Sequence, residues 1–218
     1  MAVIDGHREN LAYYAREAER LARRYEALTF EEVHAEALPW LPAASAVSST
    51  ASSTVSPAAP ATVADIGAGT GRDASALAAR GFEVTAVEPV AELRELAARL
   101  HGPTDVTWVD DALPELGRLS GPFDLVLLSA VWMHLEERQR PHALRRLSQL
   151  LHPTGRLVLT LRHGPPPEGR RMFDVTAEET LALADRCGLG LLGRSGGPDR
   201  LGRDEVRWTT LVLERGSA

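Results

Sequence analysis

The sequence predicts an α/β fold: a doubly wound sheet of seven strands, mostly parallel with an antiparallel last strand, covered by helices on both faces and preceded by a helical lid. From residue 62 onward, apolar segments alternate with amphipathic segments at helical spacing, which is typical of a parallel sheet with right-handed crossovers. The last two strand-like segments have no helix between them, so they can form an antiparallel pair. A glycine-rich turn directly follows the first strand.

The expected strands share apolar runs bounded by glycine, proline or charged residues. They span residues 62–66, 82–88, 106–109, 123–130, 156–161, 189–194 and 206–213. The intervening helices carry apolar residues three and four positions apart. They are expected at residues 73–80, 90–100, 141–151 and 176–188, the last opening on a capping-box pattern of Thr176 and Glu179.

Three regions are expected along the chain. Residues 1–42 should form a helical lid, with one amphipathic helix over 7–28 and a shorter helix that starts at a Thr29 and Glu32 capping box. Residues 43–61 contain alanine, serine, threonine, proline and valine without any charge, which predicts a flexible linker or a loop over the site. Residues 62–218 form the core.

Composition excludes several classes of function. The 218 residues carry a net charge of −6, so a nucleic-acid partner is not expected and a small-molecule acceptor is favoured. All 24 cationic side chains are arginine, which excludes a Schiff-base lysine and a P-loop lysine. A single cysteine, Cys187, fits a reducing cytoplasmic location, and no apolar run approaches the ~18 residues that a membrane span needs.

The turn after the first strand carries three alternate glycines, Gly67, Gly69 and Gly71. Glycine takes positive φ without strain and has no Cβ, so the backbone can approach a ligand closely, and the following helix directs its free N–H groups to the same place. A dinucleotide fingerprint that starts at Gly67 would need glycine at position 72, where Arg72 stands.

The pattern Asp65-x-Gly67-x-Gly69-x-Gly71 resembles the signature of class I S-adenosylmethionine-dependent methyltransferases, and the resemblance covers residues 62 to about 214. It implies methyl transfer from S-adenosyl-L-methionine to an oxygen or nitrogen of a small molecule by in-line displacement. It also implies a seventh strand inserted beside the fifth. The turn residues expected around the cofactor are Gly67, Ala68, Gly69, Gly71 and Arg72.

Other strand ends carry further candidates. Glu88 closes the second strand 21 residues after Gly67, where an acid can accept hydrogen bonds from two ribose hydroxyls. The resemblance implies that Asp110 or Asp111 accepts from the adenine amino group and that Ala112 bonds the ring; Asp111 is the first choice, and either acid could instead cap a helix.

The resemblance also gives roles at the methionine end. Asp65 would order that end or simply tie the turn together, and the carbonyl of Ser129 would face the methionine amino group. Tyr13 or Tyr14 could close over the cofactor from the lid, although Tyr14 also falls on the apolar stripe of its helix.

Two histidines are candidate bases for an acceptor that must lose a proton: His134 beyond the fourth strand and His163 after the fifth. Relatives often use a histidine at the first position as pocket wall, so that role stays open for His134. No metal site is expected, because the other histidines lack ligand spacing.

The loops after the fifth and sixth strands are flanked by cations that could recognise a carboxylate or phosphate, or remain solvated: Arg162, Arg170, Arg171 and Arg203. Two rival functions remain, a nicotinamide-dependent oxidoreductase and a non-catalytic S-adenosylmethionine-binding regulatory module. The first is disfavoured by Arg72 and by the absence of lysine.

Overall fold

The computed structural model describes residues 2–43 and 59–216, with side chains from residue 8 onward. Residues 44–58 of the linker expected over 43–61 therefore lie outside the described residues. Within the described part of the chain, no helix is both long enough and apolar enough to cross a bilayer.

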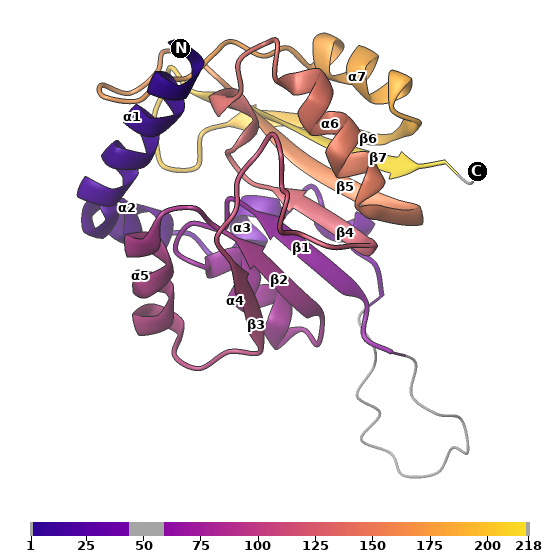
Figure 1. Cartoon of the computed structure of the whole chain (residues 1–218), viewed down its shortest axis with the longest axis horizontal. Helices are drawn as coiled ribbons and strands as arrows, with labels where there is room; N and C mark the ends of the chain where they lie inside the picture. The colour runs from indigo at the N-terminus through magenta and orange to yellow at the C-terminus, as the bar shows by residue number, and fades with distance from the viewer. Residues whose placement is uncertain (1, 44–58, 217–218) are drawn as a thin grey trace.

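A seven-stranded sheet forms the centre of the molecule, in the order β3-β2-β1-β4-β5-β7-β6 (Figure 1). The first five strands are mutually parallel, and β7 runs antiparallel between β5 and β6. The predicted fold class and the insertion of the last strand beside the fifth are both confirmed. The strands are β1 (Thr62–Ile66), β2 (Glu83–Val87), β3 (Val106–Val109), β4 (Phe123–Leu128), β5 (Leu151–His163), β6 (Leu189–Pro198) and β7 (Arg207–Arg215).

Two strands extend at least four residues beyond their predicted bounds. β5 begins five residues before the expected start, because Leu151 pairs with Phe123 ahead of a register shift that absorbs Thr154, whose φ is +64°. β6 continues to Pro198, past a second register shift between Leu191 and Gly193. Irregular pairing of this kind breaks the period-two pattern on which the prediction of a strand depends.

Helices cover both faces of the sheet. Successive side chains of a strand point to opposite faces, and the apolar residues of β4 therefore need cover on both sides. In β4, Leu125 and Leu127 pack toward α3 (Phe30–His34) and α4 (Arg72–Ala79). Val126 and Leu128 pack toward α6 (Arg140–Gln149) and α7 (Ala177–Arg186) on the opposite face.

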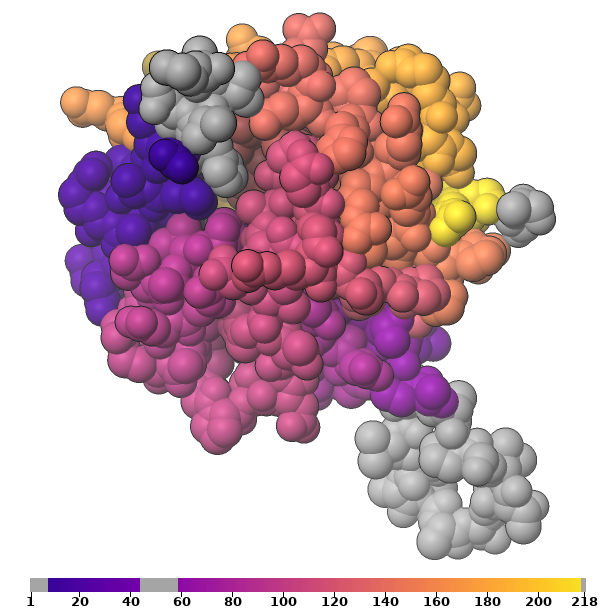
Figure 2. All heavy atoms as spheres, in the orientation of Figure 1, coloured from indigo at the N-terminus to yellow at the C-terminus, as the bar shows by residue number. Residues whose placement is uncertain are grey.

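The N-terminal helices lie beside the edge where the parallel strands end (Figure 1). The single helix expected over 7–28 is two helices, α1 (Ala2–Arg16) and α2 (Ala18–Tyr25), which meet at Glu17. Ala18 and Ala22 pack on Leu93 and Leu96 of α5 (Ala91–His101), and Figure 2 shows the indigo lid atoms directly against the magenta atoms of that region.

The predicted capping box of α3 is present: Thr29 Oγ1 accepts from Glu32 N at 3.2 Å, and Glu32 Oε2 accepts from Thr29 N at 2.8 Å. A 3-10 turn, η1 (Leu38–Trp40), follows that helix, and another, η2 (Trp132–His134), follows β4. The lid thus runs from the cavity side of the sheet to the face covered by α4.

Candidate active site

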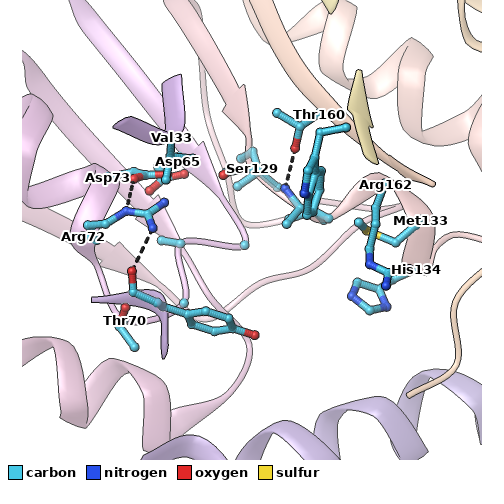
Figure 3. Close-up of a pocket in the computed structure, with 18 of the residues that line it drawn as sticks. Val33, Asp65, Thr70, Arg72, Asp73, Ser129, Met133, His134, Thr160 and Arg162 are labelled. Atoms are coloured by element: carbon cyan, nitrogen blue, oxygen red, sulfur yellow. Dashed lines mark hydrogen bonds and ion pairs between the residues drawn. The ribbon is translucent and has the colours of Figure 1, made fainter. Parts of the chain in front are cut away.

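A cavity of about 510 Å³ lies where β1, β2, β4 and β5 end, beneath the N-terminal helices. Its lining joins the glycine-rich turn to residues of α1, α2 and the loops after β4, β5 and β6. Open α/β sheets bind ligands at this edge. Figure 3 shows Asp65 and Asp73 at one end, Ser129 and Thr160 between, and Arg162 and His134 at the other.

The three turn glycines all have positive φ, at +73°, +58° and +80°. A Cβ on Gly67 would stand 2.5 Å from Val131 Cγ2, and one on Gly71 would stand 3.0 Å from Ala97 Cβ. A Cβ on Gly69 would meet no atom within 4 Å, although this residue lines the cavity. Packing therefore requires two of the glycines, whereas Gly69 leaves the space in front of the turn open.

Glu88 stands directly behind that open space and is 5% exposed. Its Oε2 accepts from Gly69 N and its Oε1 from Val90 N, both at 2.9 Å. Burial raises the pKa of this carboxyl, and the two backbone donors act against that rise. Each carboxylate oxygen keeps a second lone pair. Glu88 thus keeps acceptor capacity for a ligand hydroxyl.

Asp65 is buried at the end of β1 and lines the cavity. Burial and the neighbouring Asp73 raise the pKa of its carboxyl, while a hydrogen bond from Ala74 N lowers it. Among the described atoms its Oδ2 has no hydrogen-bond partner. An orphaned buried carboxylate oxygen beside a cavity fits a cationic or hydrogen-bond-donating ligand.

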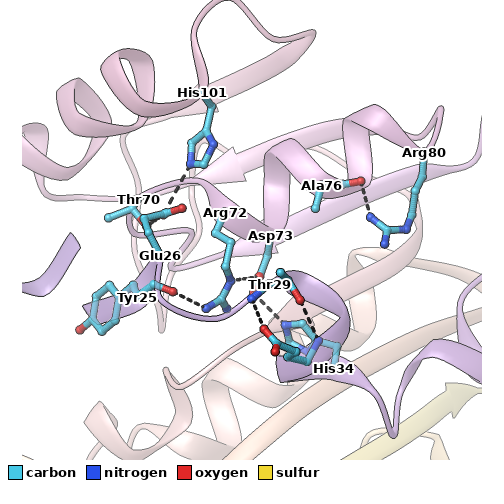
Figure 4. Close-up of polar contacts among 11 residues, drawn as sticks. Tyr25, Glu26, Thr29, His34, Thr70, Arg72, Asp73, Ala76, Arg80 and His101 are labelled. Atoms are coloured by element: carbon cyan, nitrogen blue, oxygen red, sulfur yellow. Dashed lines mark hydrogen bonds and ion pairs between the residues drawn. The ribbon is translucent and has the colours of Figure 1, made fainter. Parts of the chain in front are cut away.

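A polar network ties the lid to the glycine-rich turn (Figure 4). Asp73 bonds His34 Nε2 at 2.8 Å and Arg72 Nε at 2.7 Å, and Arg72 Nη1 donates to Tyr25 O at 3.0 Å. Nearby, Thr70 Oγ1 donates to Glu26 Oε1. Arg72 was expected to lie around the cofactor. It lines the cavity, but its guanidinium is hydrogen-bonded to Tyr25 O in the lid and to Asp73.

Asp73→Asn is expected to lower the free energy of unfolding by about 3 kcal/mol, because it leaves buried His34 and Arg72 without a carboxylate. Burial opposes ionisation of Asp73, but His34 and Arg72 outweigh it and hold the pKa of this carboxyl below its usual value. That stabilisation is present above about pH 4 and is lost as the pH falls further.

Urea unfolding at several pH values measures this effect. The gap between wild type and Asp73→Asn should narrow below about pH 4, and Asp105→Asn, at an exposed site, should match wild type throughout. A gap that is absent at pH 7, or equally large in strong acid, would contradict the role given to the ion pair.

The third strand leads to the acids expected at the adenine. Asp111 and Ala112 line the cavity, and the Asp111 carboxylate accepts from Ala112 N at 2.8 Å and Arg118 N at 2.6 Å. Asp110 is exposed, lies 3.5 Å from Arg94 and is not part of the lining. The geometry therefore favours Asp111 as the candidate adenine ligand, whereas Asp110 forms a surface ion pair with Arg94.

His134 and Tyr14 meet at the far end of the cavity. Tyr14 Oη lies 2.9 Å from His134 Nε2, and His134 Nδ1 lies 3.2 Å from Arg171 O. Burial, with Tyr25 adding to it, raises the pKa of the Tyr14 hydroxyl, so this group stays protonated and donates to Nε2. The imidazole proton is then assigned to Nδ1, facing the carbonyl. Asn10 holds that segment by bonding both Arg171 N and Arg171 O.

The structure places the other candidate base, His163, outside the cavity. Its Nε2 lies 2.9 Å from Thr209 Oγ1, and it is not part of the cavity lining. Successive strand residues point to opposite faces, so Arg162 faces the cavity and His163 does not. Ser129 lines the cavity, on a loop held by the 2.8 Å bond from Ala130 N to Thr160 Oγ1.

Several lining residues were not identified from the sequence. Asn10, Arg24 and Asp199 line the cavity from the lid and from the loop between β6 and β7. The only feature of the sequence that bears on Arg24 is its position on the polar face of the expected amphipathic helix. Within the described residues, no group of three His, Cys, Asp or Glu side chains could hold a metal ion.

Residues 63–155 match a family model described as a methyltransferase domain. An uncharacterized methyltransferase of Geobacillus kaustophilus is 34% identical over 97 residues, which are 44% of this chain and 44% of that protein. The match thus spans less than half the length of this curated relative.

Solved structures share the fold. The chain is similar to 1,6-didemethyltoxoflavin-N1-methyltransferase of Burkholderia thailandensis, crystallised with S-adenosylhomocysteine, with a TM-score of 0.60 and 24% identity over 72% of each chain. It is similar to magnesium protoporphyrin IX methyltransferase of Synechocystis PCC 6803, with a TM-score of 0.58 and 18% identity over 72% of this chain and 70% of that one. Residues 63–155 thus match a methyltransferase domain, and the chain shares its fold with these solved methyltransferases.

Proposed function

We propose that this chain binds S-adenosylmethionine in the cavity and transfers its methyl group to an oxygen or nitrogen of a small molecule. The observation that carries the proposal is the open space in front of Gly69, backed by the buried carboxylate of Glu88. The relatives with bound S-adenosylhomocysteine or S-adenosylmethionine support it.

When bound, S-adenosylmethionine supplies an electrophilic methyl group on a sulfonium. Glu88 accepts hydrogen bonds from ribose hydroxyls. Asp111, whose carboxylate already accepts from Ala112 N, uses its remaining lone pairs to accept from the adenine amino group. Asp65, whose Oδ2 has no partner among the described atoms, receives the cationic methionine end. The lid excludes water, so the chain contributes mainly alignment and desolvation.

Proton removal from the acceptor falls to the Tyr14 and His134 pair. Tyr14 Oη takes the acceptor's proton as it passes its own to His134 Nε2, across the 2.9 Å contact. The imidazolium that forms keeps its Nδ1 proton directed at Arg171 O. The positive charge therefore develops on the His134 imidazole, which is already hydrogen-bonded at both ring nitrogens.

A nicotinamide-dependent oxidoreductase is disfavoured by two observations. Arg72 occupies the third glycine position of a dinucleotide fingerprint, and β7 is antiparallel, unlike the strands of a dinucleotide-binding fold. A regulatory module that binds S-adenosylmethionine without turnover would share the whole cofactor end. Formation of S-adenosylhomocysteine over a panel of acceptors separates that alternative from an enzyme.

Gly69→Ala is expected to weaken S-adenosylhomocysteine binding at least tenfold in calorimetric titration, because its Cβ would project into the open space. Gly188→Ala is the matched control: Gly188 has φ +71°, its Cβ would also meet nothing within 4 Å, and it lies outside the cavity lining. Both variants carry the same left-handed backbone strain. Equal affinities in the two variants, or tighter binding of NADPH by wild type, would refute the proposal.

A further inference from the structure

Four arginines from separate segments converge on the cavity. Arg24 comes from α2, Arg162 from β5, Arg170 from the loop after β5, and Arg203 from the loop between β6 and β7; all four line the cavity. Burial lowers the pKa of Arg24 and of Arg162, and repulsion from the other arginines of the group lowers both further. The four cations are therefore close enough to interact.

Only one of these cations has a carboxylate partner. Asp199 bonds Arg203 through Nε at 2.9 Å and Nη2 at 2.5 Å, and its Oδ1 also accepts from Trp208 Nε1. Among the described residues, no carboxylate lies within salt-bridge distance of Arg24, Arg162 or Arg170. Three positive charges thus remain without a paired anion in a partly closed cavity.

Arg162 is the most constrained of the three. It is 7% exposed, its Nη1 and Nη2 donate to Gly164 O and Pro165 O, and its buried Nε has no partner among the described atoms. Arg170 Nε is likewise buried without a partner, while its guanidinium covers the Tyr14 ring at 5.0 Å. Buried guanidinium groups with free donors are unfavourable unless an anion completes them.

We propose that the methyl acceptor carries a carboxylate or phosphate group, held by Arg24, Arg162 and Arg170. This inference rests on the proposed function. The basic cluster adjoins the proton-accepting pair, because Arg170 covers Tyr14 and Figure 3 shows Arg162 reaching toward His134. Asp65 and Glu88 lie at the opposite end of the cavity, beside the glycine-rich turn, so an anionic group of the acceptor is directed to the arginines and away from these acids.

The lid offers a matched pair of variants for the test. Arg23 and Arg24 are neighbours in the last turn of α2, but Arg23 is exposed and outside the lining, whereas Arg24 is half-buried and lines the cavity. Arg23→Gln and Arg24→Gln remove the same charge from the same helix end. Among the described residues, neither Arg23 nor Arg24 makes a side-chain hydrogen bond to a loop, whereas Arg162 bonds Gly164 O and Pro165 O.

The probes are inorganic phosphate and acetate, titrated at constant ionic strength while Tm is followed, with S-adenosylhomocysteine titrated in parallel by calorimetry. We expect phosphate or acetate to raise the Tm of wild type and of Arg23→Gln at the same concentrations, and Arg24→Gln and Arg162→Gln to need about tenfold more of that anion. The anion that acts on wild type distinguishes a phosphate group from a carboxylate.

Equal responses of Arg23→Gln and Arg24→Gln, or no response of wild type to either anion, would overturn the inference. A tenfold loss of S-adenosylhomocysteine affinity in Arg24→Gln with unchanged anion binding would also overturn it, because the cluster would then serve the methionine carboxylate. Anion binding without any S-adenosylhomocysteine binding by wild type would instead overturn the proposed function.

Discussion

Glu88→Gln is expected to weaken S-adenosylhomocysteine binding by about 30- to 100-fold, or about 2 to 3 kcal/mol. The amide keeps the shape of the side chain but has one acceptor oxygen where the carboxylate has two. Both carboxylate oxygens already hold backbone donors, from Gly69 and Val90, so the amide group must face one of these N–H groups. The substitution thus removes a ribose acceptor and also loosens the turn.

Calorimetric titration measures the affinity, and urea unfolding separates the two consequences. The apoprotein should lose about 1 to 2 kcal/mol, the effect of leaving one buried backbone N–H without an acceptor. Glu83→Gln, at the exposed start of the strand that precedes Glu88, controls for the loss of one negative charge. If Glu88→Gln bound the ligand as tightly as Glu83→Gln does, Glu88 would have no part in ribose recognition.

The fold could be predicted because its signals are local. β1 and β3 have the predicted bounds, since each is an apolar run that ends at a turn residue. The capping box of α3 is a sequence pattern that acts within four residues, and at α7 the Thr176 half of the predicted box is present, while the Glu179 carboxylate binds Arg140 instead. Two features that were not predicted depend on tertiary contacts. The bend at Glu17 lets α2 pack on α5, and the early start of β5 needs Phe123 as a pairing partner.

The site divides in the same way. The proposed cofactor end consists of two short segments, the turn from Asp65 to Gly71 and the acid at Glu88, and the spacing of these residues is visible in the sequence. The acceptor end is assembled from α1, α2 and three loops, and nothing in the sequence signals that Arg24 and Arg162 would share a cavity. His163 lies one position away from a cavity-lining residue. Successive residues of a strand point to opposite faces, so Arg162 faces the cavity and His163 faces away from it.

His134→Gln is expected to lower kcat about 100-fold with the best acceptor from the panel. The proton accepted through Tyr14 needs the lone pair of His134 Nε2, and a glutamine amide cannot hold that proton. Binding of S-adenosylhomocysteine should stay within twofold of wild type, because the cofactor end does not use this side chain. Tyr14→Phe should reproduce the loss by removing the hydroxyl 2.9 Å from Nε2. His142→Gln, at an exposed site outside the cavity, should leave kcat unchanged.

The pH dependence distinguishes a base from a wall of the pocket. An ionising imidazole gives wild-type kcat a rise with pH that His134→Gln must lack, since glutamine does not ionise in this range. A purely structural role predicts the opposite pattern: a raised KM, weaker S-adenosylhomocysteine binding as the Asn10 contacts loosen, and an unaltered pH profile. Because Tyr14→Phe keeps the ring against Arg170 while deleting the hydroxyl, an unchanged kcat in that variant would exclude the relay even if His134 proved essential.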